Sequence, residues 1–591
     1  MSQEGGAAPP QGNGGPAGCP FGPGRAASGA GVTVQVPGIA ASEAAGQAAA
    51  ALAAEGAPAA LASADATLWG PQAQEDASAG LGWLRAPEAS RRLLPEIAGI
   101  AERARRDGLD HIVLAGMGGS SLAPGVIAGA AGVPLTVLDT TDPHQVARAL
   151  GEALERTLVV VSSKNGTTIE TDSHRRIYER AFAQLGMSRP DVARRFVVVT
   201  DPGSPLDKLA ADAGYHVVRA DPHAGGAYSA LTAFGLVPSA LAGADIAALL
   251  AEGDAAAATL ATPDGPGAAL GAALGGYASA GHDKAVLAGP GSGLPGFGDW
   301  AEQLIAGSTG KEGRGILPVM VEDQDAPGFS PGPDIHLIVL ANRQGADGSG
   351  GPGGCGAAEQ AGSAGQPAKP ADTMVTGPLG AQFVVWEYAV ALAGKLLGIN
   401  PFGQRGAAEA EQRTLSLLER AAAGPLPAGE PAFTDGAVEV HADPGLLNGA
   451  GNLPAVIDEL LLTLPERGYL AVMAYLDPAG DARTRELRRA LAARTTHPVT
   501  FGWGPRFLHS TGQYHKGGPQ TGVFLQITGA VTDDIEVPGR PFTLGRLQLA
   551  QALSDLDALR SRNRPAVRLH LRNRDAGIAQ LLGAAAVRGA E

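Results

Sequence analysis

Short runs of apolar residues recur through the first half of the chain. Five of them begin at residues 111, 134, 157, 195 and 215 and read HIVLAG, PLTVLD, TLVVVSS, RFVVVTD and YHVVRAD. Each run is nearly continuous, which is typical of a strand that is buried on both faces. Segments rich in Ala, Glu and Arg separate the runs and predict helices, for example HRRIYERAFAQLG from His174. Strands that alternate with helices indicate parallel βαβ units, so we expect a doubly wound sheet that ends near residue 260.

The same pattern begins again in the second half. The runs KAVLAGPGSG from Lys284 and HLIVLAN from His336, with the helical pattern FVVWEYAVALAGKLLG from Phe383, predict a second α/β domain that ends near residue 425. Three later runs, at residues 469, 498 and 522, predict strands of a C-terminal α/β segment. The two α/β units look like a structural duplication, although no repeat at the level of residues proves one.

Two stretches carry almost no residues that could be buried. Residues 1–30 are mostly Gly, Pro, Ala and polar residues, and 345–372 are equally rich in Gly, so we expect a disordered tail and a flexible insert. The predicted organisation is therefore a tail over 1–30, a first domain over 31–260, a second over 261–425 that contains the insert, and a C-terminal segment over 426–591. A chain of 591 residues has room for this number of units.

Composition narrows the possible functions. Hydrophobic residues make up 45% of the chain and the net charge is -15, which favours a globular protein and argues against non-specific binding of nucleic acid. The two cysteines, Cys19 and Cys355, both lie in Gly-rich stretches and predict neither a disulfide framework nor a metal site. The N-terminal residues show no export signal, and no apolar run is long enough to span a membrane. We therefore expect a soluble protein of the cytoplasm.

Two polar turns follow neighbouring predicted strands. GMGGSS, at residues 116–121, comes after the strand from His111 and before a predicted helix, where backbone N–H groups can bind an anion. The second turn, SSKNGTT at residues 162–168, follows the next strong strand and brings its polar groups to the same sheet edge. The first turn taken alone is also compatible with a plain tight turn, and it departs from the dinucleotide-binding pattern because Ser121 replaces the third glycine.

The second turn adds the chemistry of a phosphate site. Lys164 supplies positive charge, Ser163, Thr167 and Thr168 supply hydroxyl groups, and Asn165 supplies an amide donor. A helix cap would explain one or two of these residues but not the whole set. The predicted phosphate-binding residues are Gly119, Ser120, Ser163, Lys164, Asn165, Thr167 and Thr168.

The pairing of GMGGSSLAP with SSK.GTT.ET resembles the sugar-phosphate site of glucose-6-phosphate isomerases. Further segments of this family follow in the same order, beginning at Asp221, Gly296, Gly377 and Phe501. The resemblance covers roughly residues 60–580 apart from the insert, and it is to the isomerase half of bacterial proteins in which transaldolase and glucose-6-phosphate isomerase are fused. No transaldolase barrel is expected in this sequence. The resemblance implies two sugar-isomerase (SIS) type doubly wound domains plus the C-terminal α/β segment.

The resemblance also implies an activity. The family interconverts glucose 6-phosphate and fructose 6-phosphate through a cis-enediol, within glycolysis and gluconeogenesis, as a homodimer without metal or organic cofactor. This chemistry needs a carboxylate base, a cation that stabilises the enediolate, and a His with a Lys for ring opening. A sugar phosphate is therefore the expected partner, with neither nucleic acid nor membrane involved.

Three of the family's catalytic side chains are replaced in this sequence. The family motifs place Gly307 where the base Glu belongs, Ala227 where the Arg belongs and Glu411 where the Lys belongs. Glu302 is not expected to replace the base, because five residues along a helix turn a side chain by about 140°. Losing a general base or an oxyanion donor typically removes ~10²- to 10⁴-fold in rate, so we expect strongly reduced activity.

His509 in LHSTGQ matches the family's ring-opening His, and a structural His bonded to backbone remains an equal alternative. The sequence thus predicts a glucose-6-phosphate isomerase with reduced activity or, alternatively, a catalytically degenerate sugar-phosphate-binding protein with a regulatory role. A nucleotide-dependent oxidoreductase would rest on GMGGSS alone and lacks an acidic partner for a ribose.

Overall fold

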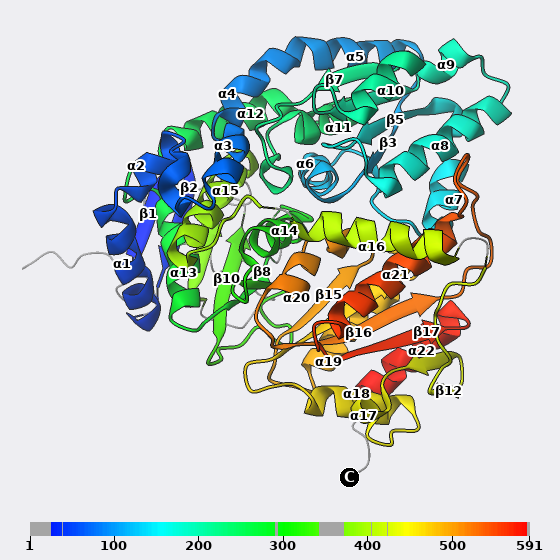
Figure 1. Ribbon diagram of the computed structural model, residues 1–591. Coiled ribbons are helices and arrows are strands. Elements are labelled where there is room, and N and C mark those ends of the chain that lie inside the picture. Colours follow the sequence, from blue (N-terminus) through cyan, green and yellow to red (C-terminus); the bar gives the residue numbers. More distant parts are fainter. Residues whose placement is uncertain are drawn as a thin grey trace, which may run out of the picture.

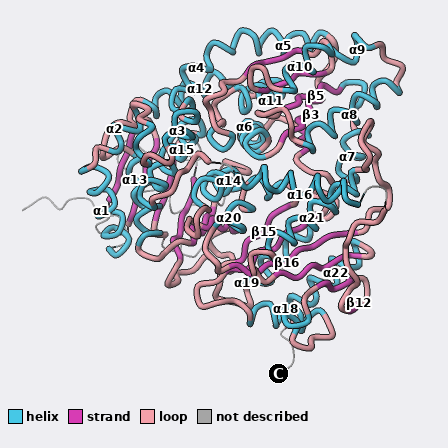
Figure 2. Tube along the Cα trace, in the orientation of Figure 1, coloured by secondary structure: helices cyan, strands magenta, loops and turns pink. Residues whose placement is uncertain are grey.

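Three separate β-sheets organise the computed structural model, which describes residues 25–37, 39–289, 293–341, 371–403, 405–421 and 424–587 (Figure 1). In Figure 1 the first sheet lies at the upper right, the second at the left and the third at the lower right, and helices surround each of them (Figure 2). Most of the predicted insert, and both cysteines, fall outside the described residues.

The first sheet has five parallel strands in the order β4-β3-β5-β6-β7. Alternate residues of its strands enter different cores: Leu114 and Val160 pack with α5, α6 and α11, whereas Val113 and Val159 pack with α7 and α8. Burial on both faces explains why these strands read as continuous apolar runs. The strands are β3 (His111–Gly116), β4 (Thr136–Leu138), β5 (Thr157–Ser162), β6 (Phe196–Thr200) and β7 (His216–Arg219); the main helices are α5 (Leu94–Arg106), α6 (Leu122–Ala131), α7 (Pro143–Gly151), α8 (Ile169–Gln184), α9 (Arg189–Ala193), α10 (Pro205–Ala213), α11 (Ala233–Ala242) and α12 (Ile246–Ala257).

The second sheet has the order β1-β2-β11-β10-β8-β9 and combines four parallel strands with an antiparallel N-terminal hairpin. Its strands are β1 (Arg25–Gly29), β2 (Val32–Val36), β8 (Lys284–Ala288), β9 (Leu317–Val321), β10 (Ile335–Ala341) and β11 (Thr373–Thr376). Its helices include α1 (Ile39–Ala54), α2 (Ala57–Ala62), α3 (Gln74–Gly80), α4 (Ala86–Ser90), α13 (Pro266–Ser279), α14 (Phe297–Thr309) and α15 (Leu379–Leu397).

The N-terminal hairpin corrects the predicted boundaries. A tail that reaches residue 30 and a first domain that starts at residue 31 are wrong for β1 and β2, because β2 pairs with β11 of the second sheet. Valines alternate along β2, and all three are buried, so this short strand gains a covered face only by joining a sheet with helices on it. Its short apolar run alone did not reveal that partner.

The third sheet lies in the predicted C-terminal segment and has the order β12-β13-β17-β16-β14-β15 with its own core. Strands β14 to β17 are parallel to one another. At the other edge of the sheet, β13 pairs antiparallel with β17, and β12 pairs antiparallel with β13. The predicted α/β class with parallel sheets is therefore confirmed. The strands are β12 (Phe433–Asp435), β13 (Val438–His441), β14 (Tyr469–Tyr475), β15 (Val499–Trp503), β16 (Gly522–Gly529) and β17 (Ala566–Leu571), and the helices are α17 (Pro444–Leu447), α18 (Leu453–Leu462), α19 (Glu486–Ala492), α20 (Gly512–Gly517), α21 (Leu544–Arg560) and α22 (Arg574–Ala586).

Helix α16 (Arg405–Ala421) runs between the first and third sheets in Figure 1 and packs on α20 and α21. Among the described residues no helix has the length and apolar character needed to cross a membrane.

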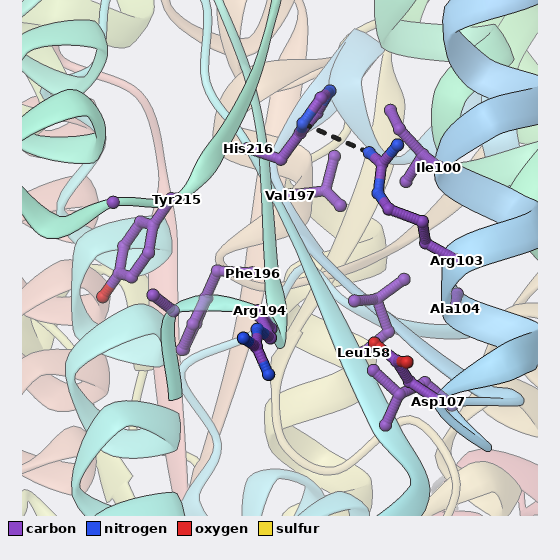
Figure 3. A pocket seen from close by; sticks show the side chains of 13 residues that line it. Ile100, Arg103, Ala104, Asp107, Leu158, Arg194, Phe196, Val197, Tyr215 and His216 are labelled. Carbon is purple, nitrogen blue, oxygen red and sulfur yellow. Dashed lines mark hydrogen bonds between the residues drawn. The ribbon is translucent and has the colours of Figure 1, made fainter. Parts of the chain in front are cut away.

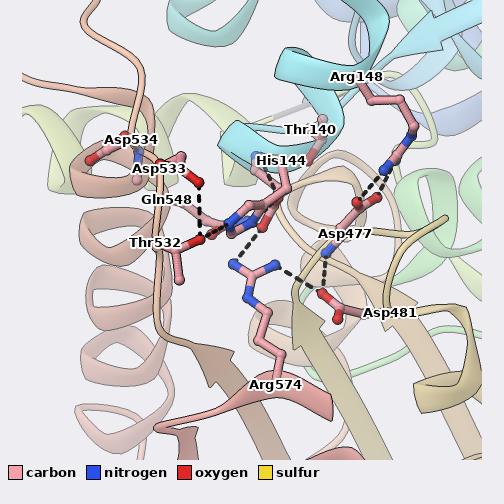
Figure 4. Close-up of polar contacts among 12 residues, drawn as sticks. Thr140, His144, Arg148, Asp477, Asp481, Thr532, Asp533, Asp534, Gln548 and Arg574 are labelled. Carbon is pink, nitrogen blue, oxygen red and sulfur yellow. Dashed lines mark hydrogen bonds and ion pairs between the residues drawn. The ribbon is translucent and has the colours of Figure 1, made fainter.

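A partly buried polar network also joins the first and third sheets (Figure 4). Arg148 of α7 makes two hydrogen bonds, of 2.8 and 2.7 Å, to the Asp477 carboxylate after β14. Arg574 at the start of α22 lies 2.9 Å from both Asp142 and Asp481. Because Asp142 has no exposed side chain, its negative charge depends on Arg574 for compensation. The network therefore fixes the loop between β4 and α7 against the C-terminal segment.

Candidate functional site

The two polar turns lie at the carboxyl edge of the first sheet. Gly116 and Ser162 are paired neighbours at the ends of β3 and β5, so the turns that follow them start side by side. The first turn forms the short 3-10 helix η4 (Gly118–Ser120) and leads into α6. The second turn ends at Thr168, the residue that caps the N-terminus of α8. Both turns thus point toward a helix N-terminus, a position that favours anions.

The hydroxyl groups of the second turn are gathered by short contacts. The side-chain oxygens of Ser163 and Thr168 are 2.9 Å apart, and the Gly166 N–H donates to the Ser163 hydroxyl. Gly166 has a positive φ of 69°, and an added Cβ would lie 2.6 Å from the backbone N of Leu206, so only glycine fits this turn. Asn165 and Thr167 are exposed, and Ser120 is half-buried.

Lys164 is turned toward the neighbouring strand ends. Its ammonium group lies 2.8 Å from Asp201 after β6 and donates a hydrogen bond of 2.9 Å to the Pro222 carbonyl. Burial raises the pKa of Asp201, although Lys164 lowers it in part. The lysine charge is therefore shared with a carboxylate at this edge.

The first turn is in direct contact with the segment that carries Ala227. This residue lies in the 3-10 helix η6 (Gly226–Tyr228), is only 3% exposed and belongs to the apolar core. A Cβ added to Gly119 would lie 1.7 Å from the Gly226 carbonyl oxygen, a distance that no real contact allows. The glycine at position 119 is therefore required by the close approach of η4 and η6.

Gly119→Ala is expected to destabilise the protein by about 1–3 kcal/mol, because the two backbone segments must separate. Gly125→Ala is the matched control, since an added Cβ in α6 meets nothing within 4 Å. There the substitution should be neutral or stabilise by up to about 1 kcal/mol. Thermal unfolding of the two variants beside the wild type provides the measurement. Equal melting temperatures would show that η4 and η6 do not touch in solution.

Helix α14 brings position 307 to the same region. The Tyr228 hydroxyl donates to Ser308 across 2.9 Å, which fixes α14 against η6. A Cβ added to Gly307 meets nothing within 4 Å, so the position expected to hold the family's base faces open space. Glu302 is buried on another side of the helix, where burial and the neighbouring Asp299 raise its pKa well above the usual range. The charged groups near it are Asp299, Arg485 and Arg506, as expected for a side chain directed away from Gly307.

His509 ends the 3-10 helix η9 (Arg506–His509), beside the first turn and α14. The side-chain amide of Gln303 donates to the backbone carbonyl of His509 across 3.0 Å. The Cβ of His509 would be 3.2 Å from a Cβ added to Gly118. The imidazole Nε2 lies 3.6 Å from the Glu170 carboxylate, and its side chain is 23% exposed. Burial lowers the pKa of His509, but Glu170 outweighs it and the net shift is upward. A partly exposed imidazole with a buried carboxylate behind it is suited to proton transfer.

Glu411 on α16 belongs to the same group of charges. Burial and the nearby Glu170 raise the pKa of Glu411 to about 6, and the backbone N–H of Ile169 acts in the opposite direction. The Glu411 carboxyl thus faces the N-terminus of α8, next to Thr168. The position expected to hold the family's lysine holds an acid here, so the charge around His509 is more negative than a lysine would make it.

The structure also shows what surrounds the site. No group of three or more His, Cys, Asp or Glu side chains that could hold a metal ion occurs among the described residues.

A cavity of about 300 Å³ lies at the other edge of the first sheet, near the amino ends of β5, β6 and β7 (Figure 3). Arg103 and His216 are hydrogen-bonded at its rim, across 3.3 Å. The cavity lies away from the polar turns and is not the candidate site.

Glu170, Gln551 and Arg506 were not among the predicted site residues. Glu170 stands two residues after the hydroxyl turn, where an acid in the first turn of a helix could have been noticed as a partner for a cation. Arg506 binds Asp139 across 2.7 Å and so holds η9 against the end of β4. Gln551 lies far away in the sequence on α21, and no local pattern marks it.

The fold and the site define an α/β protein in which one edge of a parallel sheet carries two polar turns near the His509–Glu170 pair. Within the chain, residues 98–259 match the family model for phosphoglucose isomerase. The crystal structure of a glucose-6-phosphate isomerase from Chlamydia trachomatis has a similar fold, with a TM-score of 0.52 and 20% identity over 68% of this chain and 90% of that one.

Two relatives are similar in sequence. A probable glucose-6-phosphate isomerase of Haloarcula marismortui is 36% identical over 215 residues, which cover 35% of this chain and 49% of the relative. The glucose-6-phosphate isomerase of Desulfitobacterium hafniense is 35% identical over 264 residues, which cover 39% of this chain and 48% of the relative. The chain thus spans about half the length of these curated relatives.

Proposed function

We propose that this protein is a glucose-6-phosphate isomerase with low turnover, which interconverts glucose 6-phosphate and fructose 6-phosphate. The observation that carries the proposal is the meeting of two polar turns with the His509–Glu170 pair, since His509 lies 3.6 Å from Glu170 and its Cβ borders Gly118. The turns would bind the phosphate through backbone N–H groups and the hydroxyls of Ser163 and Thr168, and His509 would move the ring-oxygen proton.

Low turnover is proposed because the groups for the second proton transfer are replaced. Gly307 supplies no carboxylate, Ala227 supplies no cation and Glu411 reverses a charge. The same replacements favour the second candidate, a sugar-phosphate-binding protein without catalysis that regulates a partner. A coupled isomerase assay on the purified protein separates the two: measurable turnover that His509→Asn abolishes supports the first, and binding without turnover supports the second. We also propose a homodimer in the cytoplasm, which light scattering and cell fractionation would test.

Removing the hydroxyl groups of the second turn is expected to weaken the binding of sugar phosphates. The double variant Ser163→Ala with Thr168→Val should bind 6-phosphogluconate or fructose 6-phosphate about 10- to 100-fold more weakly, because hydrogen bonds to a charged group are lost. Ser173→Ala is the matched control: its hydroxyl donates to the Ile169 carbonyl inside α8 and lies outside the turn. Thermal shift titrations measure the affinities. Unchanged binding in the double variant would remove the turn from the site, and no stabilisation of the wild type by any sugar phosphate would contradict both candidate functions.

A further inference from the structure

A buried chain of hydrogen bonds stands behind the His509–Glu170 pair. The Thr141 hydroxyl donates to the side-chain oxygen of Gln551 across 2.7 Å, and the Gln551 amide nitrogen donates to Glu170 Oε1, also across 2.7 Å. The same Glu170 oxygen is the one that lies 3.6 Å from His509 Nε2. Thr141, Gln551 and Glu170 are 0%, 3% and 3% exposed, so water does not replace these partners easily.

The donor and acceptor groups determine the direction of these hydrogen bonds. Glu170 is a carboxylate and accepts hydrogen bonds only, so the Gln551 side chain must present its NH₂ group to it. The amide oxygen is then turned toward Thr141, whose hydroxyl can donate to it. The opposite orientation would place two oxygens against each other at Glu170. Glu170 therefore fixes the orientation of the Gln551 amide, and the Thr141 hydroxyl completes the arrangement by donating to the amide oxygen.

This series of hydrogen bonds joins parts of the molecule that are far apart in sequence. Thr141 lies in the loop after β4, Glu170 opens α8 of the first sheet, and Gln551 and His509 belong to the C-terminal segment. Two other contacts hold the same loop, since Asp139 binds Arg506 and Asp142 binds Arg574. The position of Gln551 relative to Glu170 is consequently fixed by the contact between the two segments.

We propose that Gln551 is a positioning residue, which with Thr141 holds Glu170 ionised and aligned so that Glu170 keeps His509 protonated for ring opening. This inference rests on the proposed function in so far as His509 transfers a proton to the sugar. A buried carboxylate without a donor would take up a proton or turn toward another partner, and His509 would lose its counter-charge. Gln551 thereby acts through Glu170 and does not touch the substrate.

Several charged or titratable groups face this pair. His509 faces Glu170 on α8, Glu411 on α16 and Lys516 on α20, and Lys516 is itself paired with Asp555 across 2.7 Å. Glu170 faces His174 within α8, and the buried Tyr475 at the end of β14 faces Glu170 in turn. Despite burial, the pKa of Glu170 is lowered, with His509 as the main stabilising partner. Gln551 is an uncharged donor on Glu170, so removing it tests the chain without changing the net charge.

The test compares two buried amides of helix α21. Gln551→Leu removes the donor to Glu170, whereas Gln548→Leu removes a similar donor that is bonded to Asp142, across 3.2 Å. NMR of protein labelled with ¹³C at histidine Cε1 follows the protonation of His509, whose signal is assigned with His509→Asn. We expect Gln551→Leu to move the His509 titration to lower pH, Thr141→Val to move it less in the same direction, and Gln548→Leu to leave it in place.

Turnover provides a second readout. Gln551→Leu should lower kcat about 10- to 100-fold, the worth of a hydrogen bond to a charged group, and shift the limb of the pH profile that belongs to His509 to lower pH. An unmoved His509 titration in Gln551→Leu, or an equal shift in Gln548→Leu, would overturn the inference. If Gln551→Leu does not fold, the smaller Thr141→Val change decides in the same way. A wild type without turnover contradicts the proposed function, while the NMR comparison still decides the role of Gln551.

Discussion

Gly307→Glu is expected to raise isomerase turnover by ~10²- to 10⁴-fold, which is the usual contribution of a positioned general base. The structure has room for the new side chain, since an added Cβ at this position meets nothing within 4 Å. The position lies in the last turn of α14, where replacing glycine also favours the helix by about 0.5–1 kcal/mol. A coupled assay from fructose 6-phosphate to glucose 6-phosphate measures the gain.

Gly307→Gln is the control for that experiment. Glutamine has the same length and helix preference but cannot take a proton from carbon, so only the glutamate variant should gain turnover. A second check is exchange of the substrate's C2 hydrogen with solvent, which requires a base. Equal rates for the two variants, or a rate for Gly307→Glu no higher than the wild type, would show that position 307 is not directed at the substrate.

Arg574→Leu is expected to cost about 3–5 kcal/mol of stability, because it leaves buried carboxylates without their cation (Figure 4). Asp142 is fully buried and Asp481 nearly so, and both lie 2.9 Å from the guanidinium. Burial already raises the pKa of Asp481 while Arg574 lowers it. Without the arginine the folded state holds more protons than the unfolded state, so the loss should grow from pH 5 to pH 8. Urea unfolding at both pH values measures it.

Arg572→Leu is the matched surface control for Arg574→Leu. Its side chain is 60% exposed and lies 3.6 Å from Glu439, so the change should stay within about 1 kcal/mol and depend little on pH. A similar cost for both variants would mean that the buried network does not join the first and third sheets in solution.

The sequence predicted the parts of the fold in which burial leaves a local trace. All five strands of the first sheet and the strands β8, β10, β14, β15 and β16 coincide with continuous apolar runs. Strand β17 was missed because Arg568 and His570 interrupt its pattern; Arg568 is nonetheless buried and donates to the Ala428 carbonyl. Strand β9 carries Pro318 and reads poorly as a strand. In these cases the surrounding structure overrides the local pattern.

The candidate site was predictable where a motif lies on one turn of the chain. Ser163 and Thr168 lie five residues apart on one turn of the chain, whereas the contact of Gln551 with Glu170 depends on the packing of separate segments. The partner of Lys164 was equally hidden, since Asp201 belongs to the next strand. Whether the predicted residues bind phosphate stays a prediction that the ligand titrations will decide.

The N-terminal hairpin has a consequence for synthesis of the protein. Strand β2 leaves the ribosome before any residue of the first sheet, yet its partner β11 is made only after that sheet is complete. Until then its unpaired edge and its three valines have no cover, a condition that invites association between nascent chains. Protection by chaperones during synthesis would therefore matter more for this chain than for one whose N-terminal hairpin pairs with a strand made soon after it. Moving the hairpin by circular permutation to a position after β11 should raise the soluble yield.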